Sequence, residues 1–334
     1  MKVSAKVFAL FGSTVVLLAG CGESQPPLGG SGAMPQTLAV ATLADRAKSW
    51  MLPEATSEDL LYVTNYGNVM VFAYPGLKLV GRLRGFYSSV GACVDAHGDV
   101  FITNYGHSLK KPGEIAEYAH GGTKPVMLLK PKRVGAVGCA IDPTTGNLAI
   151  SGFGEPPTVD VFKGAKGEPA LYKDSILVEH QFCGFDNHGN LFVAGLRAWT
   201  GTAGLVELPK GGSKFVQVDL DATISSGGGV QWDGKHMAIG AYENSSPVIY
   251  QFAIAAAKGT KVGTTTLGNP ADLTLQFFIS KDIVLVPNWY FKSSGEEVKD
   301  VLFYKYPAGG APTADMSKHR LIDPRGVALS LAPK

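Results

Sequence analysis

The sequence has no excess of charge of either sign. The 334-residue chain contains 30 Lys and Arg residues and 28 Asp and Glu residues. Two of the basic residues, Lys2 and Lys6, stand among the first 20 residues, so the rest of the chain carries 28 charges of each sign. A protein that binds nucleic acid needs a basic face to meet the phosphate backbone. The charge balance therefore excludes nucleic acid from the expected partners.

The apolar run near the N-terminus, Val7–Gly20, is too short to span a bilayer comfortably. A positive segment followed by a short apolar run is instead typical of an export signal. The run ends in Leu18-Ala19-Gly20-Cys21, which resembles the lipobox of bacterial lipoproteins. This resemblance implies that residues 1–20 are a signal peptide, and that Cys21 is lipidated and becomes the mature N-terminus.

Residues 21–48 are predicted to be a flexible tether with a short N-terminal segment. Gln25–Gln36 is rich in Pro, Gly and Ser, which is typical of linkers, and residues 38–50 favour a short helix. Acyl chains on Cys21 would hold the protein, expected to be a monomer, at a membrane surface. By resemblance to lipoprotein sorting, Gly22 favours the periplasmic face of the outer membrane or the cell surface.

Cysteine is scarce, since the chain contains only Cys93, Cys139 and Cys183 besides the lipobox residue. No Cys-x-x-Cys pair and no Cys/His spacing indicates a zinc site. An exported chain can oxidise one pair. Cys139 and Cys183 each stand three residues before a turn aspartate, so neighbouring strands of like register would bring these two close. Three buried free thiols are the alternative.

Glycine is abundant at 42 residues, which suits a fold of many tight turns. The stretch Val90–Gly122 predicts three short strands, and Pro125–Leu129 a fourth. Related stretches recur with turn aspartates 47, 44 and 47 residues apart, at Asp95, Asp142, Asp186 and Asp233. Four strands per unit at a period in the forties are typical of β-propeller blades.

The two ends of the chain complete the pattern. Leu60–Gly67 matches a second strand with no first strand before it, and Arg325–Ser330 supplies a first strand at the C-terminus. Sharing one blade between the ends would close the ring and leave no open sheet edge. Five whole units and one split unit predict an all-β fold: a six-bladed β-propeller of four-stranded antiparallel blades over residues 49–334.

The blade pattern resembles that of NHL-like six-bladed propellers. Three segments, SWMLPEA (49–55), DLLYVTNYG (59–67) and GDVFITN (98–104), also resemble exported bacterial members of that group. The resemblance covers about residues 49–334 and implies the fold. It does not fix an activity, because such propellers include binding platforms and several enzyme types.

Two recurring positions have a structural interpretation. The Asp-x-x-Gly turns offer one acid each, whereas calcium needs six or more oxygen ligands, so Asx turns are predicted. One position of every second strand is large and mostly aromatic, which predicts a packing layer between blades; an aromatic ring around a ligand is the alternative. Its residues are Tyr66, Tyr105, Phe153, Leu196, Tyr242 and Trp289.

A binding face is predicted where the loops before the first strands meet the loops between second and third strands, around the channel mouth. Many blades converge there, and loops vary without touching the core. This face is expected to bind a protein, a glycan or a small molecule. The candidate ligand-binding residues are Arg133, His180, Arg197, Trp199, Asn288 and Arg325.

The alternative function is enzymatic. Gluconolactonase-type propellers hold a divalent cation in the channel through a Glu, an Asn and an Asp from different blades. Resemblance to them implies a metal-dependent hydrolase with Glu179, Asn288 and Asp323 as the nearest metal ligands. A divalent cation is the cofactor that this alternative implies.

A lyase would use different chemistry on the same face. His180 would act as general acid or base, with Glu179 and Asp323 as further catalytic candidates, while Arg133 or Arg325 would stabilise a carboxylate. Ion pairs between these acids and arginines are the non-catalytic interpretation. No catalytic spacing stands out, so the sequence favours binding.

Overall fold

The structure, a computed structural model, describes residues 45–106, 113–132, 135–154, 156–197, 202–224, 228–268, 275–291 and 294–333. The chain divides into two units, residues 1–37 and 38–334, and all described residues belong to the second. Their regular structure is β apart from the helical residues 45–46 and short 3-10 helices at Pro53–Thr56 (η1), Lys163–Ala165 (η2) and Ser317–His319 (η3). No helix in this part of the chain is long and apolar enough to cross a membrane. Of the helix predicted over residues 38–50, residues 38–44 lie outside the described residues; residues 45–46 are helical, whereas Trp50 belongs to a strand.

The described strands form five sheets in which strands consecutive in the chain pair antiparallel. The first sheet, in the order β1-β4-β3-β2-β25, contains β1 (Trp50–Met51), β2 (Asp59–Asn65), β3 (Asn68–Tyr74), β4 (Lys78–Arg84) and β25 (Pro324–Ser330). A four-stranded meander follows, made of β5 (Ser89–Val94), β6 (Val100–Asn104), β7 (Glu114–Tyr118) and β8 (Met127–Leu129). The next meander consists of β9 (Gly135–Ile141), β10 (Leu148–Phe153), β11 (Thr158–Phe162) and β12 (Ala170–Lys173).

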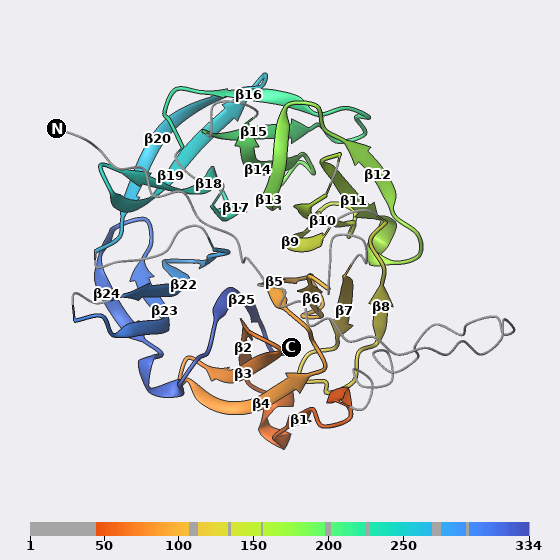
Figure 1. Cartoon of the computed structure of the whole chain (residues 1–334), viewed down its shortest axis with the longest axis vertical. Coiled ribbons are helices and arrows are strands. Elements are labelled where there is room, and N and C mark those ends of the chain that lie inside the picture. The colour runs from red at the N-terminus through yellow and green to blue at the C-terminus, as the bar shows by residue number, and fades with distance from the viewer. Residues whose placement is uncertain are drawn as a thin grey trace, which may run out of the picture. The chain divides into compact units, whose positions relative to one another are not determined.

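Two further meanders share one eight-stranded sheet. The first consists of β13 (Leu177–Phe185), β14 (Leu191–Arg197), β15 (Ala203–Leu208) and β16 (Val216–Leu220). The second consists of β17 (Val230–Trp232), β18 (Met237–Glu243), β19 (Ser246–Ala255) and β20 (Lys258–Thr266), and a short parallel bridge joins β16 to β20. The last sheet contains β21 (Phe278–Ser280), β22 (Ile283–Phe291), β23 (Glu297–Lys305) and β24 (Gly309–Asp315). Figure 1 shows the sheets of this unit around a common centre, with the first strand of each meander innermost.

The C-terminal strand β25 supplies the inner strand of the first sheet. It pairs antiparallel with β2, from Leu60 opposite Ser330 to Asn65 opposite Pro324. Six of the seven residues of β2, Leu60–Asn65, therefore have partners on both sides, β25 on one and β3 on the other. This confirms the prediction that the two ends of the chain share one sheet.

The innermost strands lie so close that their backbones require small residues. A Cβ on Gly138 of β9 would lie 3.0 Å from Gln181 O of β13, and one on Gly184 of β13 would lie 2.7 Å from Val230 O of β17. Buried hydroxyl groups of second strands bridge to the inner strand of the next sheet. Each hydroxyl donates to a backbone oxygen: Thr64 to Val90 O (2.6 Å), Thr103 to Val137 O (2.8 Å) and Ser151 to Gln181 O (2.8 Å).

Two glutamine side chains complete this central network. The Gln231 amide donates to Ile279 O (2.9 Å) and accepts from Ile279 N–H (2.7 Å), which links β17 to β21. The Gln276 amide does the same with the backbone of Ala92 in β5, at 2.8 Å in both directions. Each partly buried amide thus satisfies one donor and one acceptor of another sheet.

The turn aspartates make the Asx turns that the sequence predicts. Asp95 Oδ1 accepts the N–H groups of His97 (2.8 Å) and Asp99 (2.9 Å). The other three bond the backbone of their own turns in the same way: Asp142 with Thr144, Asp186 with His188 and Asn190, and Asp233 with Lys235 and His236. These carboxylates order the turns, which confirms the structural interpretation over calcium binding.

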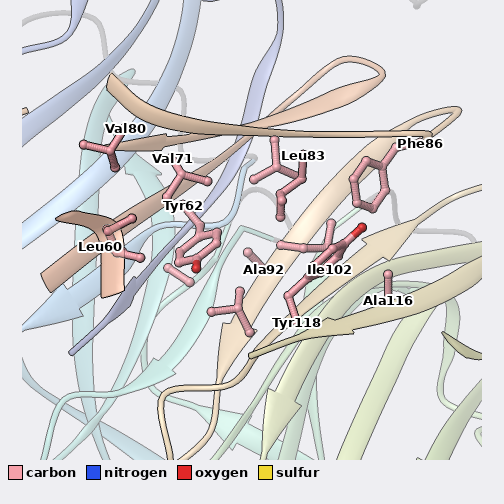
Figure 2. Packing of buried hydrophobic residues seen from close by; sticks show 14 residues of the cluster. Leu60, Tyr62, Val71, Val80, Leu83, Phe86, Ala92, Ile102, Ala116 and Tyr118 are labelled. Atoms are coloured by element: carbon pink, nitrogen blue, oxygen red, sulfur yellow. The ribbon is translucent and has the colours of Figure 1, made fainter. Parts of the chain in front are cut away.

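The hydrophobic core lies between neighbouring sheets rather than inside any one of them. Figure 2 shows the cluster between the first sheet and the β5–β8 meander. The fully buried ring of Tyr62 lies in it, and the Tyr62 hydroxyl accepts the N–H of Gly121 from the turn after β7 (3.0 Å). The sheets are therefore held to each other both by apolar burial and by specific hydrogen bonds.

The disulfide joins Cys93 to Cys139, with their Cα atoms 5.8 Å apart, and Cys183 is free and buried. The predicted pairing of Cys139 with Cys183 and the alternative of three free thiols are both wrong. Cys139 and Cys183 have the same register, so both side chains point to the preceding sheet and not to each other. The Cys139 sulfur lies against Phe101 O, and the Cys183 thiol lies against Ala149 O. Cys93 stands one position nearer its turn, so it faces the opposite way, toward Cys139.

Candidate functional site

The unit has two faces around its centre. We call the side with the turn aspartates Asp95, Asp142, Asp186 and Asp233 the turn face. The opposite side, where the chain passes between sheets and from second to third strands, we call the loop face. The sequence places the binding face on the loop face, but several of its segments lie outside the described residues.

A cavity of about 260 Å³ opens at the centre of the turn face. We call it the axial cavity. Its wall consists of the ends of inner strands from five meanders, at Ala92–Val94, Cys139–Ile141, Cys183–Phe185, Val230–Trp232 and Gln276–Phe278. Five large apolar side chains of this wall are only partly buried: Val94, Ile141, Phe185, Trp232 and Phe278.

The polar groups of this wall are already engaged. Gln231 and Gln276 bond backbone groups of other sheets through both ends of their amides. Cys93 and Cys139 form the disulfide, and burial raises the pKa of the Cys183 thiol to about 12, so this group stays protonated at neutral pH. The described wall thus offers apolar contact but no acid, base or nucleophile.

A groove of about 600 Å³ adjoins the axial cavity, since Val94 and Phe278 line both. Its wall is formed by the turn Asp95–Gly98, by Phe278–Ser280 and by the C-terminal residues Leu331–Pro333. The groove brings in polar side chains that the axial cavity lacks: Asp95, His97 and Ser280.

Negative charge gathers beside the groove. Burial and the Asp95 carboxylate raise the pKa of Asp99, and burial together with Asp99 and Asp95 raises the pKa of Glu117. Raised carboxyl pKa values are what mutual repulsion and partial desolvation produce. These acidic side chains stand beside the groove and not in the wall of the axial cavity.

His180, the predicted general acid or base, is fully buried. Its Nε2 lies 3.0 Å from Asp174 Oδ2 and its Nδ1 lies 3.2 Å from Thr158 O, and neither side chain of the pair is exposed. Asp174 also accepts the N–H groups of Ile176 (2.8 Å) and Leu177 (3.2 Å). Both ring nitrogens are occupied by these contacts, and the His180–Asp174 pair lies in the core.

Asp323 and Arg325 form an ion pair with each other. Arg325 Nη2 lies 2.7 Å and its Nε 2.9 Å from Asp323 Oδ2, on partly exposed side chains. This is the non-catalytic interpretation of both residues, and an exposed pair of this kind contributes about 0–1 kcal/mol. The pair leaves Arg325 less available to a carboxylate ligand than the sequence suggests.

Asn288 occupies a strand position at which two other asparagines accept hydrogen bonds from loops of the loop face. In the equivalent place on β2, Asn65 Oδ1 accepts the N–H groups of Ile322 (2.6 Å) and Asp323 (2.9 Å). On β6, Asn104 Oδ1 accepts those of Tyr87 and Ser88, at 3.0 and 2.9 Å. Asn288 is likewise fully buried, on β22. The shared position points to a loop-ordering role.

The predicted metal ligands Glu179, Asn288 and Asp323 come from or adjoin three different sheets. Glu179 is half-buried on β13 opposite Leu196, and the Asp323 carboxylate is engaged by Arg325. The residues that the structure describes include no group of three or more His, Cys, Asp or Glu side chains placed to hold a metal ion. Of the remaining candidates, Arg197 is half-buried at the end of β14, whereas Arg133, Trp199 and Cys21 lie outside the described residues.

Asp300, which lies opposite Asn288 on β23, gives a prediction on pH dependence. Burial raises its pKa to about 6, with a contribution from Asp315, although Oδ1 accepts the N–H groups of Val301 and Met316 at 2.7 Å. Because the folded-state pKa exceeds the unfolded one, the folded state binds the proton more tightly. The free energy of unfolding therefore falls as the pH rises from about 4 to about 6.

Replacing Asp300 by asparagine keeps the Oδ1 acceptor and removes the charge. We expect Asp300→Asn to raise the free energy of unfolding at pH 7 by about 1–3 kcal/mol and to flatten its change between pH 4 and 6. Urea unfolding at several pH values measures this, with the exposed Asp219→Asn as control. An unchanged pH profile would contradict the assignment.

The recurring aromatic position has two environments. Tyr105 and Phe153 pack edge to face with ring centroids 5.9 Å apart, as predicted for a layer between sheets. Tyr66 and Trp289, however, are 55% and 46% exposed. At these two places the prediction of a packing layer is wrong, because the loop face leaves the end of the strand uncovered.

Sequence reasoning missed the axial cavity. Its signal is present, because a large apolar residue directly precedes each of the four turn aspartates although the turns themselves are exposed. These residues are Val94, Ile141, Phe185 and Trp232.

No protein-family model matches the chain, and no curated protein matches its sequence. Among solved structures, the chain is similar to a chain of the nidogen/laminin complex, with a TM-score of 0.60 and 13% identity over 83% of this chain and 100% of that one. It is also similar to a functionally unknown protein from Desulfotomaculum acetoxidans DSM 771, with a TM-score of 0.53 and 11% identity over the same shares. At these identities the likeness concerns the fold alone. Together with the sheets around a common centre, it supports a β-propeller fold.

Proposed function

We propose that this chain is an exported, lipid-anchored binding protein, a six-bladed NHL-like β-propeller that holds a small apolar molecule in its axial cavity. Residues 1–20 are the signal peptide, residues 21–48 the tether and residues 49–334 the propeller. The β17–β20 and β13–β16 meanders are separate blades that share an edge. The lipid on Cys21 keeps the protein at the periplasmic face of the outer membrane or at the cell surface.

The axial cavity is the observation that carries the binding function. Together with the groove it is within the size range of small-molecule sites, which are mostly apolar and have a few polar groups at one side. Phe185, Trp232 and Phe278 supply aromatic surface on which a planar ligand can stack. Burying about 200 Å² of apolar ligand surface would contribute about 5 kcal/mol before the cost of association.

The test uses N-phenyl-1-naphthylamine, a neutral apolar probe whose emission rises in apolar surroundings. We expect it to bind with energy transfer from Trp232, and Phe185→Ser to weaken binding at least tenfold, or about 1.4 kcal/mol. The anionic probe 8-anilino-1-naphthalenesulfonate should bind more weakly, because the carboxylates beside the groove repel it. Fluorescence titration measures all three effects.

Two matched variants control this experiment. Val262→Ser makes a similar change at a half-exposed site on the outer strand β20 and should leave binding unchanged. Trp232→Phe should remove most of the energy transfer while keeping an aromatic wall. Equal binding by the wild type and Phe185→Ser, or transfer that survives in Trp232→Phe, would contradict a site in the axial cavity.

A further inference from the structure

Exposed large apolar side chains are unevenly distributed between the two faces. On the loop face, Phe291 is 64%, Tyr66 55%, Ile322 53%, Tyr87 47% and Trp289 46% exposed. At the turn-face end of the described strands, Leu331 and Val126 are comparably exposed, at 55% and 58%, but both are aliphatic, and Leu331 lines the groove. The aromatic part of this exposed surface thus belongs to the loop face.

Three of these side chains come from neighbouring loops of the first two sheets. Tyr66 follows β2, and its N–H donates to Asp323 O, directly beside Ile322. Gly67 lies against the backbone that leads to Tyr87, since a Cβ on it would be 3.6 Å from Phe86 O. Tyr66, Tyr87 and Ile322 therefore stand on neighbouring loops of the same face.

The other two project from the end of the β22–β23 hairpin. The rings of Trp289 and Phe291 are 6.2 Å apart, and the indole N–H of Trp289 donates to Glu297 Oε1 at 2.7 Å. Lys299 pairs with Glu297 at 2.8 Å and lies 5.9 Å from the Trp289 ring. Tryptophan, phenylalanine and tyrosine beside lysine are the side chains that favour the boundary between lipid headgroups and acyl chains.

The described chain begins at this same loop face. Arg46 pairs with Glu114, the first residue of β7, and its guanidinium lies 5.9 Å from the Phe86 ring. Ser49 Oγ accepts the N–H of Arg84, the last residue of β4, at 2.9 Å. Residue 45 lies 24 residues after Cys21. A flexible linker of that length has an average span of about 25–30 Å.

From this placement we infer that the loop face lies on the lipid bilayer, with Trp289, Phe291, Tyr66, Tyr87 and Ile322 in the interfacial region. The inference rests on the proposed lipid anchor. A short tether leaving from the loop face confines that face near the membrane, and its exposed aromatic side chains then gain contact with lipid. The axial cavity opens on the opposite face, away from the bilayer.

The experiment places the full lipidated protein in phosphatidylcholine vesicles whose acyl chains carry bromine close to the headgroup. Bromine quenches indole emission on contact. The emission of the wild type minus that of Trp289→Phe is the emission of Trp289. We expect this emission to be about half as strong in brominated vesicles as in vesicles without bromine. The corresponding difference for Trp232→Phe, in the axial cavity, should be unaffected by bromine.

Two outcomes overturn the inference: an unquenched Trp289, or quenching of Trp232 to the same extent. If Trp289 is unquenched in pure lipid vesicles but is shielded from a soluble quencher in native membranes, the loop face binds a protein partner instead of lipid. Failure of the anchor is a different result, because the protein would then not sediment with vesicles and Cys21→Ser would behave like the wild type.

Discussion

Replacing His180 by leucine is expected to lower the free energy of unfolding by about 3–5 kcal/mol. The change leaves the Asp174 carboxylate in a site with no exposed side-chain surface, where only the N–H groups of Ile176 and Leu177 still approach it. An uncompensated buried charge costs far more than the pair itself contributes. Urea denaturation followed by circular dichroism measures the loss.

Two further variants separate the buried pair from histidine chemistry in general. His188→Leu removes an imidazole whose side chain is 76% exposed, and it should change stability by less than about 0.5 kcal/mol. Adding Asp174→Asn to His180→Leu removes the stranded charge, so the double variant should be more stable than His180→Leu alone. If His180→Leu unfolds like His188→Leu, the pair contributes nothing to the fold.

Removing the disulfide is expected to have the second largest effect. Cys93 and Cys139 are 46 residues apart, and closing a loop of that length in the unfolded chain stabilises the folded state by about 2–4 kcal/mol. The double variant Cys93→Ala with Cys139→Ala should lose this amount, and its melting temperature should no longer respond to a reducing agent. Thermal scans with and without reductant measure both effects.

The free thiol supplies the control for the disulfide. Cys183 is buried with its pKa raised to about 12, so a maleimide should label no cysteine of the described chain until the protein unfolds. Cys183→Ala should keep the full response to reductant. Labelling of Cys93 or Cys139 in the oxidised native protein would contradict the disulfide.

The repeating frame was predictable because its signals are local. An aspartate followed by glycine at a turn, with β-branched residues on either side, specifies a hairpin wherever it occurs, and the spacing of such turns specifies the sheets. The pairing of β25 with β2 was predictable for a related reason. Only the first unit lacked a predicted inner strand, and only the end of the chain contained a predicted strand with no unit of its own.

The contacts between sheets were harder to predict. Whether Cys139 meets Cys93 or Cys183 depends on which side of a strand each residue faces, and one extra residue before the turn reverses that side. His180 was taken for a surface group because its partner Asp174 belongs to the preceding loop, and nothing in the local pattern marks the pair as buried. Burial of a polar residue is decided by its neighbours in space.

The axial cavity was missed for the opposite reason. Phe185 and Trp232 match the core pattern of their strands, and the sequence does not show that the inner strands separate before the turn face. Farther from that face, glycines such as Gly138 and Gly184 let the same strands approach each other closely. The axial cavity and the closely packed centre are thus formed by different parts of the same inner strands.

The pairing of β2 with β25 ties the integrity of the first sheet to a strand that is synthesised long after β2. Until residues 324–330 have left the ribosome, the inner edge of β2 has no partner for its N–H and C=O groups. A chain cut short by a premature stop would present that edge permanently, as a template for aggregation or a target for proteases. Only a chain that includes β25 can hide it, so the fold itself distinguishes chains that contain this strand from those cut short before it.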